Sequence, residues 1–358
     1  MCIFKKKFFS YLYIFFFTLV LILFEFSTRT ATAKIYNIYN VEIEENYDLN
    51  FDKLKVIDKA FKDAFKILIY KIVDKNDRSK FNNISINEIK SLIETFEIID
   101  EKFLNNNYKS KFNVQFNKKR ILKYLETMNV ISSVPTDIKI LILPILIDVK
   151  KGQLIYFNEN TYFKNWNKNI EDYFLINYIL PNEDIEDYLI IKKNLIDIED
   201  YNFNEIIKKY NTDSYIILLM FKKDNQLKAL SKIKFNKEYF LINRIYENYN
   251  HKDSKSSKNV ILDLKEIYDD KWKSINKLNT SIALPIKLSI NAKDIKLSKK
   301  IEETLTKIDL ISDFKIQNFN NKKTVYKIIF NSNPDKFIEI MKTYNFSIDT
   351  SNQIWRIK

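Results

Sequence analysis

A continuous apolar run of strand length, Ile138-Lys139-Ile140-Leu141-Ile142-Leu143-Pro144-Ile145-Leu146-Ile147, lies near the middle of the chain between Asp137 and Asp148. A strand that is apolar on both faces is typical of the centre of a sheet that is covered on each side. A second run of this kind occupies residues 214–221 and follows a segment with a helical pattern at 203–210. Because a helix that leads into a buried strand is α/β in character, we expect residues 135–251 to form an α/β-like middle domain.

Before this run, residues 34–134 alternate between strand and helix patterns. Val41 and Ile43 alternate with glutamates and predict a strand, and short segments at 86–95 and 112–116 predict a helix and a half-buried strand. Between the first strand and the segment 86–95, an apolar stripe at three- and four-residue spacing predicts a longer helix, with Asn50 or Asp52 as its N-cap. The stripe consists of Leu54, Ile57, Phe61, Ala64, Phe65, Leu68 and Ile72. With a last helix near residue 121, this order predicts an α+β domain with a helix on a small antiparallel sheet.

After the middle domain, the polar stretch 252–258 is rich in Ser and Lys and predicts a linker, which together with a following helix occupies residues 252–280. Residues 281–358 then alternate as strand, helix, strand, strand, helix and strand, with Asn333 and Pro334 marking the start of the last helix and 347–357 the terminal strand. This is the ferredoxin-like order. The predicted fold class is therefore α+β, with three small modules in series, the middle one α/β-like and the C-terminal one ferredoxin-like.

The first 33 residues have the three parts of a secretory signal peptide: Lys5-Lys6-Lys7, an apolar run at 8–24, and the small-x-small site Ala31-Thr32-Ala33. We therefore predict export to the periplasm with cleavage after Ala33. The alternative is an uncleaved N-terminal helix that anchors the protein in the inner membrane, although the run is short for a spanning helix.

Composition excludes several classes of function. The net charge of +13 would suit nucleic acid, but the lysines alternate with acids along the chain, and we expect neither nucleic acid nor nucleotide as a partner. Gly152 is the only glycine, which rules out glycine-rich phosphate loops, and we expect no cofactor. Cys2 and His251 are the only cysteine and histidine, so thiolate or multi-histidine metal sites are excluded. An anionic lipid or a wall polymer remains open as a partner.

Two segments carry candidate functional side chains. The turn Pro181-Asn182-Glu183-Asp184-Ile185-Glu186-Asp187 offers Asp184, Glu186 and Asp187 for acid–base chemistry or for a hard cation, or simply as caps at a helix N-terminus. An aromatic loop with Tyr156, Tyr162, Phe163 and Trp166 could hold a ligand or close over the core.

Taken together, Tyr156, Asn160, Tyr162 and Trp166, followed by Pro181, Asp184, Glu186 and Asp187, resemble a proteobacterial envelope family, domain-of-unknown-function family twenty sixty-six. Members of that family carry a Trp, an Asn-Pro-Trp, a second Trp and a Pro-Leu-Gly-Asp-Leu-Glu-Asp turn. This chain departs from the pattern at Thr161 and at Glu183, where the family has Pro and Gly. The family has no assigned activity, so the resemblance implies only an exported, periplasmic protein.

Two functional hypotheses follow. The first is a non-enzymatic binding or scaffolding protein of the cell envelope, whose partner is an envelope protein, the cell wall or the membrane surface. The second is a carboxylate-dependent enzyme that acts on a glycan or cell-wall polymer, with Asp184, Glu186 or Asp187 as acid and base and with Tyr162 and Trp166 stacking on a sugar ring. The enzyme would need two carboxyl groups about 5 to 9.5 Å apart across one cleft. The ligand-binding candidates are thus Tyr156, Asn160, Tyr162, Trp166, Asp184, Glu186 and Asp187, and the sequence predicts no oligomeric state.

Overall fold

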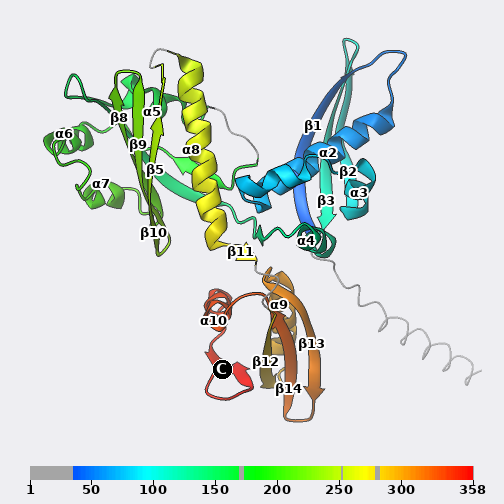
Figure 1. The fold of residues 1–358 in the computed structure, drawn as a ribbon. Coiled ribbons are helices and arrows are strands. Elements are labelled where there is room, and N and C mark those ends of the chain that lie inside the picture. Colours follow the sequence, from blue (N-terminus) through cyan, green and yellow to red (C-terminus); the bar gives the residue numbers. More distant parts are fainter. Residues whose placement is uncertain (1–34, 169–172, 251–252, 279–282, 358) are drawn as a thin grey trace, which may run out of the picture.

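The computed structural model describes residues 35–168, 173–250, 253–278 and 283–357, and Figure 1 shows them as three groups of helices and sheets. Ala31 and Ala33, the predicted cleavage site, lie outside the described residues, as does His251. Helices and strands are mixed in every group, so the predicted α+β class is confirmed.

The N-terminal group is an antiparallel sheet in the order β1-β3-β2, covered on one face by the helix α2. The predicted stripe of α2 packs against this sheet except at Leu54, which is 71% exposed in the first turn. Asp52 caps the helix by accepting a hydrogen bond from the Leu54 N–H. The predicted second helix is shorter than expected, because β2 begins directly after Leu92. The elements are β1 (Ile35–Asn46), α2 (Lys53–Ile72), the 3-10 helix η1 (Lys75–Phe81), α3 (Ile86–Leu92), β2 (Ile93–Leu104), β3 (Asn107–Asn117), α4 (Lys118–Thr127) and β4 (Ser132–Ser133).

The middle group is built around β5, the strand that the apolar run predicted. Alternate β5 side chains enter two different cores: Ile140 and Ile142 pack toward α8, and Leu141 and Leu143 pack toward α6 and α7. The strand is therefore buried on both faces, as predicted. The elements are β5 (Ile138–Asp148), β6 (Gln153–Ile155), η2 (Phe157–Glu159), α5 (Thr161–Asn165), β7 (Ile176–Ile179), α6 (Ile185–Lys193), α7 (Asn204–Lys208), β8 (Tyr215–Lys223), β9 (Gln226–Phe235), β10 (Glu238–Tyr246) and α8 (Ser254–Ile275).

Pro144 is tolerated inside β5 because one side of the strand has a gap at that point. On one side β5 pairs in parallel with β8 along residues 141–148, whereas on the other side β7 pairs with residues 138–141 and β6 with residues 146–148. The Pro144 carbonyl accepts a hydrogen bond from Asn160 Nδ2 at 2.9 Å instead of from a strand. A proline, which has no N–H to give to a ladder, fits where no ladder exists.

The middle sheet has the strand order β10-β9-β8-β5-β6, with β7 also beside β5. Helices cover its two faces to different extents. One face is covered by α8, which stands along the sheet in Figure 1 and packs against residues as far out as Phe240 and Ile242 of β10. The other face is covered by α6, α7 and the loop between them over β5 and β8, but β10 contributes no side chain to that core. Tyr239, Leu241 and Ile245 of β10 are consequently 68%, 70% and 55% exposed.

The polar stretch predicted as a linker is helical from Ser254 onward. Asp253 caps α8, because its side chain accepts hydrogen bonds from the Lys255 and Ser256 N–H groups, and Ser257 is already buried. Ser, Lys and Asp at the start of a helix have the same composition as a linker, which explains the wrong prediction.

The C-terminal group is a sheet in the order β13-β14-β12-β16-β15 with α9 and α10 packed against it. Asn333 caps α10 and Pro334 lies in its first turn, as predicted. The hairpin across residues 320–322 is also confirmed, since β13 pairs antiparallel with β14. The elements are β12 (Leu284–Asn291), α9 (Ile295–Lys307), β13 (Ile311–Phe319), β14 (Lys323–Phe330), α10 (Pro334–Thr343), β15 (Ile348–Asp349) and β16 (Trp355–Ile357). The short strand β11 (Lys277–Leu278) after α8 pairs with β4 in a separate two-stranded sheet.

The predicted single terminal strand at 347–357 is instead two short strands joined by a bend. Asp349 accepts hydrogen bonds from the Ser351 N–H and hydroxyl, at 3.0 and 2.7 Å, and turns the chain back. After this reversal β16 runs parallel to β12 and antiparallel to β15.

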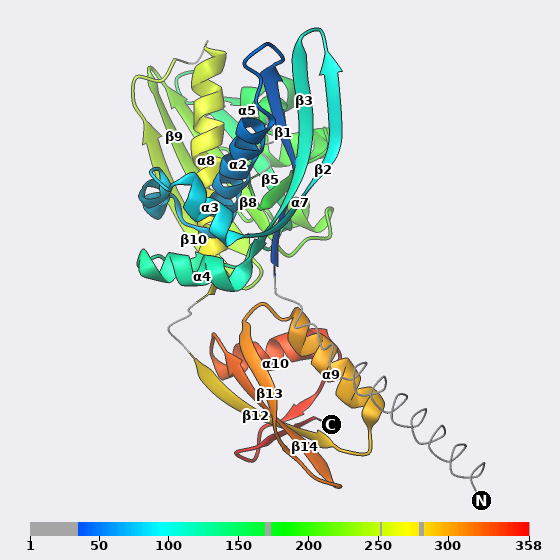
Figure 2. The same cartoon turned by 90° about the vertical axis from the view of Figure 1, so that its right-hand side faces the viewer.

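The N-terminal group meets the middle group at α8 through charged side chains, and in Figure 2 α2 and α8 lie close together. Lys273 of α8 is fully buried, with its Nζ 2.8 Å from Asp269 Oδ2, and it donates to the Val73 carbonyl at the end of α2 at 3.5 Å. Asp269 Oδ1 accepts from the Leu175 N–H, just before β7, at 2.8 Å. Burial raises the pKa of the Asp269 carboxyl, an effect that the neighbouring Lys273 opposes.

Arg78 of η1 adds a second cation to this junction. Its Nε donates to the same Val73 carbonyl at 3.3 Å, and its guanidinium lies 3.3 Å from Glu266 and 3.4 Å from Asp270 of α8. The guanidinium also lies over the Tyr70 ring, 4.2 Å from its centre. Two cations at the C-terminal end of α2 interact favourably with the helix dipole, so the junction holds α2 end-on against α8.

Replacing Lys273→Met is expected to lower the free energy of unfolding by about 3 to 5 kcal/mol, because Asp269 would remain buried without its cation. The exposed Lys258 on the same helix gives the matched control, and Lys258→Met is expected to change stability by less than about 0.5 kcal/mol. Urea unfolding followed by circular dichroism measures both. Equal stability of the two variants would mean that the buried pair does not hold the junction.

Candidate functional site

The segment predicted as an aromatic loop is partly helical, because Tyr162 and Phe163 lie in α5 and Trp166 is its C-cap. Its side chains divide between the two faces of the middle sheet. Tyr156 belongs to the core under α6 and α7, whereas Tyr162 and Trp166 belong to the core under α8. The predicted ligand-binding aromatics therefore do not meet in one concavity.

Tyr162 and Trp166 are core residues, 1% and 0% exposed. The Tyr162 hydroxyl donates to the Tyr249 hydroxyl at 2.6 Å, and burial raises the pKa of Tyr162. The Trp166 ring stacks on Tyr268 and meets Tyr178 edge to face, with ring centres 6.4 and 5.5 Å apart. Neither ring has a free face for a sugar.

Asn160 is buried and has a structural role on each side of its amide. Its Oδ1 caps α5 by accepting from the Tyr162 and Phe163 N–H groups, at 2.9 and 3.3 Å, while its Nδ2 satisfies the Pro144 carbonyl. The asparagine therefore fills the gap in the sheet beside β5.

The three carboxylates of the acidic turn have different surroundings. Asp184 caps α6 by accepting from the Glu186 N–H at 2.8 Å, and it lies 2.7 Å from Lys209 of the chain after α7. Asp187 is fully buried with its Oδ1 2.7 Å from the same Lys209 Nζ, whereas the Glu186 side chain is 84% exposed. The hydrogen bonds to Asp184 and Asp187 raise the pKa of Lys209. These side chains fasten α6 to α7 and do not face one another across a cleft.

Tyr156 and Asp187 are linked electrostatically on this face. Burial and the negative charge of Asp187 raise the pKa of the Tyr156 hydroxyl. Within the described residues, the Tyr156 hydroxyl and Asp187 Oδ2 are buried without a hydrogen-bond partner. Of the predicted site residues, the structure thus brings Tyr156, Asp184 and Asp187 together and places Tyr162 and Trp166 elsewhere.

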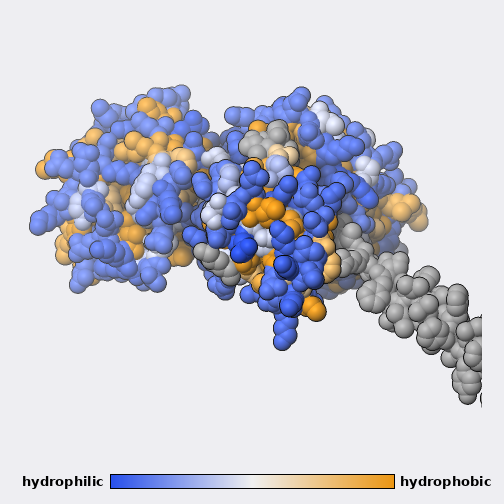
Figure 3. All heavy atoms as spheres, turned by 90° about the horizontal axis from the view of Figure 1, so that it is seen from below, coloured by the Kyte–Doolittle hydropathy of each residue, from blue (hydrophilic) through white to orange (hydrophobic). Residues whose placement is uncertain are grey.

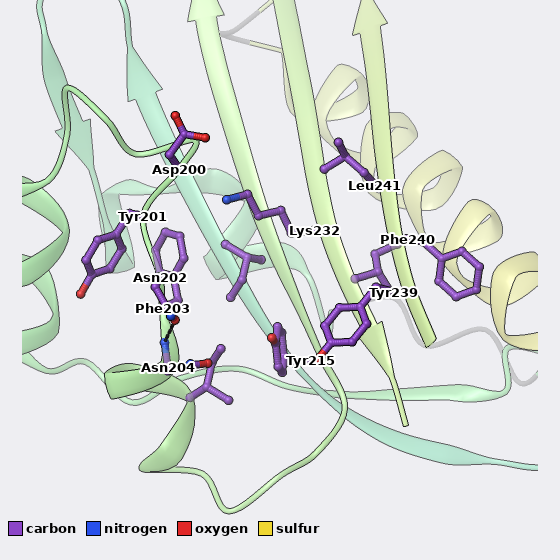
Figure 4. A pocket seen from close by; sticks show the side chains of 13 residues that line it. Asp200, Tyr201, Asn202, Phe203, Asn204, Tyr215, Lys232, Tyr239, Phe240 and Leu241 are labelled. Atoms are coloured by element: carbon purple, nitrogen blue, oxygen red, sulfur yellow. Dashed lines mark hydrogen bonds between the residues drawn. The ribbon is translucent and has the colours of Figure 1, made fainter. Parts of the chain in front are cut away.

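A pocket of about 480 Å³ lies on the half-covered face, away from all the predicted site residues. The loop before α7 supplies Tyr201 and Phe203, β8 supplies Tyr215, and β10 supplies Tyr239. Figure 4 shows the two loop rings facing the two strand rings across the pocket, with Lys232 of β9 between them. Five of the 13 residues that line the pocket are aromatic and four are aliphatic, so its walls are largely apolar.

Lysines supply the charge beside these rings. Lys234 lies over the rings of Tyr215 and Tyr239, 5.9 and 5.6 Å from their centres. In the part of the chain that the structure describes, no carboxylate lies within ion-pair distance of Lys232 or Lys234. We call the surface formed by Tyr215, Lys232, Lys234, Tyr239, Leu241 and Ile245 the β9–β10 face.

Sequence reasoning missed this surface because it did not identify the β9–β10 hairpin. A signal was present between two turns: Leu227, Ala229, Ile233 and Phe235 alternate with lysines, and only Leu230 and Ser231 break the pattern. Asp224 and Asn236 in those turns have φ of 51° and 54°, a conformation that Asp and Asn adopt more readily than other side chains.

No protein-family model matches the chain, and no curated protein matches it. The resemblance to domain-of-unknown-function family twenty sixty-six consequently stays a prediction. Among the described residues, no group of three or more His, Cys, Asp and Glu side chains is arranged to hold a metal ion.

Replacing Lys209→Met is expected to destabilise the protein by about 3 kcal/mol, because Asp187 would stay buried without its cation. The neighbouring exposed Lys208 provides the control, and Lys208→Met is expected to leave stability within about 0.5 kcal/mol. Urea unfolding measures both. If Lys209→Met were as stable as the control, Asp187 would not need its cation.

Stability should also depend on the protonation of Asp184. The hydrogen bonds from Lys209 and from the Glu186 N–H lower the pKa of Asp184 in the folded state. Its stabilisation is therefore present above the unfolded-state pKa of about 3.9 and is lost as the pH falls through the lower folded-state pKa. Asp184→Asn keeps the cap oxygen but does not titrate, so the urea midpoint of this variant should fall less than that of the parent between pH 5 and pH 2. Parallel pH curves would contradict this role.

Proposed function

We propose that this protein is an exported, non-enzymatic binding protein of the cell envelope and that the β9–β10 face is its recognition surface. The observation that carries the proposal is the aromatic pocket, which continues into the exposed side chains of Leu241 and Ile245. A concave aromatic surface with few charged groups is typical of a binding site. In Figure 3, apolar side chains reach the surface as spots among hydrophilic residues.

The side chains around the pocket favour binding over catalysis. Among the residues that line it, Asp200 is the only carboxylate and Lys232 the only amine, and neither histidine nor cysteine is present. Glycoside hydrolysis of the usual kind needs two carboxyl groups across one cleft. The carboxylate-enzyme alternative has no observation in its favour, because Asp184 and Asp187 are engaged by Lys209.

The periplasmic location is part of the proposal and is supported by the N-terminal sequence pattern, with cleavage after Ala33. No described helix is both long and apolar enough to cross a membrane. Membership of domain-of-unknown-function family twenty sixty-six is likewise proposed, on the residues from Tyr156 to Asp187 that resemble its motifs.

We also propose the finer division of the fold into three modules in series, at 34–134, 135–251 with the helix of 252–280, and 281–358. It is supported by a buried cluster centred on each of the first and last modules and by two clusters that share the middle sheet. Leu278, Leu122 and Val134 join the cluster of the last module to the other two. A ferredoxin-like fold of the last module is supported by the strand order β13-β14-β12-β16. The parallel pairing of β16 with β12 departs from that fold.

Photo-crosslinking in the envelope tests the binding proposal. A benzophenone side chain at position 239 should form specific adducts with an envelope component, and Tyr201→Ala in the pocket should lower their yield. The control is the same group at position 319, because Phe319 is equally exposed on β13 of another module. Adducts at 239 that are no more abundant than at 319, or that ignore Tyr201→Ala, would refute the proposal.

A further inference from the structure

We infer that the β9–β10 face binds an extended, acidic polypeptide segment, which adds to the middle sheet as a new strand along β10. This inference rests on the proposed function and names the partner of the same surface.

In the described part of the chain, the backbone of β10 has a free edge. Among the described strands β10 pairs only with β9, and it stands at the end of the sheet order. The nine-residue strand Glu238–Tyr246 therefore has one edge whose N–H and C=O groups no described strand uses. Such an edge is a template for strand addition, unless it is short, bulged or covered. The β9–β10 pairing is regular along its whole length.

The side chains beside this edge determine what kind of strand fits. Across the ladder, Tyr239 lies opposite Lys234, Leu241 opposite Lys232, and Ile245 opposite Lys228. Lys228 is engaged by Glu199 at 3.2 Å, which leaves Lys232 and Lys234 for a partner. Lys232, Lys234, Leu241 and Ile245 share one face of the sheet, and a strand added to β10 would lie two strand spacings, about 9.6 Å, from β9. On that face it would place apolar side chains beside Leu241 and Ile245, and Glu side chains long enough to reach the lysines across β10. Because successive side chains of a strand point to opposite faces, charge complementarity favours apolar and acidic residues at every second position, all on the face of the lysines.

The aromatic pocket provides an anchor at one end of the strand. Its volume of about 480 Å³ is sufficient for a large apolar side chain, which would lie between Tyr201 and Tyr239. A glycan would use the rings, but it would gain nothing from the aliphatic side chains of Leu241 and Ile245 or from a free backbone edge. The observations therefore favour a polypeptide.

A synthetic ten-residue peptide tests the inference, with the full chain in mild detergent and fluorescence anisotropy as the readout. Its odd positions carry Glu and Ile in turn and one Phe, so that these side chains share one face, and its even positions carry Thr. The matched probe replaces every Glu by Lys. We expect saturable binding of the acidic probe and at least about tenfold weaker binding of the lysine probe, which corresponds to about 1.4 kcal/mol.

Variants locate the binding surface. Lys232→Glu and Leu241→Glu should each weaken binding of the acidic probe about tenfold. Lys299→Glu on α9 makes the same change of net charge as Lys232→Glu on an exposed helix of another module, and it should have less than about a twofold effect. Circular dichroism confirms that each variant is folded.

Equal binding of the two probes, or an equal effect of Lys299→Glu and Lys232→Glu, would overturn the inference. If the probes fail while a lipid or glycan is crosslinked specifically at position 239, the inference is wrong and the proposed function stands. If position 239 captures nothing above position 319, both are wrong.

Discussion

The buried contact of Lys273 with Asp269 and with the Val73 carbonyl is the interaction on which the arrangement of the chain depends. It fixes α8 to the segment before β7 through the Leu175 N–H and to the end of α2 through Val73. A cation and an anion are both removed from water at this point, which is costly unless each finds its partners. The junction is consequently specific: α8 has one position along the sheet, and α2 has one place to end.

Because α8 is fixed in this way, one face of the middle sheet is closed as far as β10, and the other face is left to α6, α7 and their loop. Those elements are short, and Lys209 ties them together over β5 and β8 through Asp184 and Asp187. They pack over β5 and β8 but not over β10. One face of the hairpin is exposed because these elements are too short to cover it. The aromatic pocket lies at the boundary between the covered and uncovered halves.

The parts of the fold that the sequence predicted are those whose signals are local. The apolar run of β5 predicted a strand buried on both faces, and Asn333-Pro334 predicted the start of α10, because a cap and a proline act within one turn. The acidic turn at Asp184 was also correctly interpreted as having a capping alternative. In each case neighbouring residues contain the physical cause.

The failures have non-local or ambiguous causes. Between Tyr156 and Trp166 the chain crosses from one face of the sheet to the other. No residue near them predicts this crossing, because it depends on the positions of β6 and of the gap beside Pro144. The stretch before Val260 has the composition of a linker, but it is the capped first part of α8, whose later residues from Val260 onward pack against the middle sheet. The alternation and the turns of the β9–β10 hairpin did predict a hairpin. Its exposed face, however, results from the absence of a described element that covers that side of β10, and no local pattern predicts this absence.

Amide hydrogen exchange on the free chain, resolved by residue, tests the central claim. This claim is that both faces are covered over β5 and β8, whereas the outer edge of β10 is free. The account predicts the slowest exchange in β5 and β8, which have paired neighbours and two covered faces, and fast exchange at alternate amides of β10, whose outer edge is free. Protection along all of β10 as strong as that of β8 would contradict the account, because it would mean that the edge is already covered.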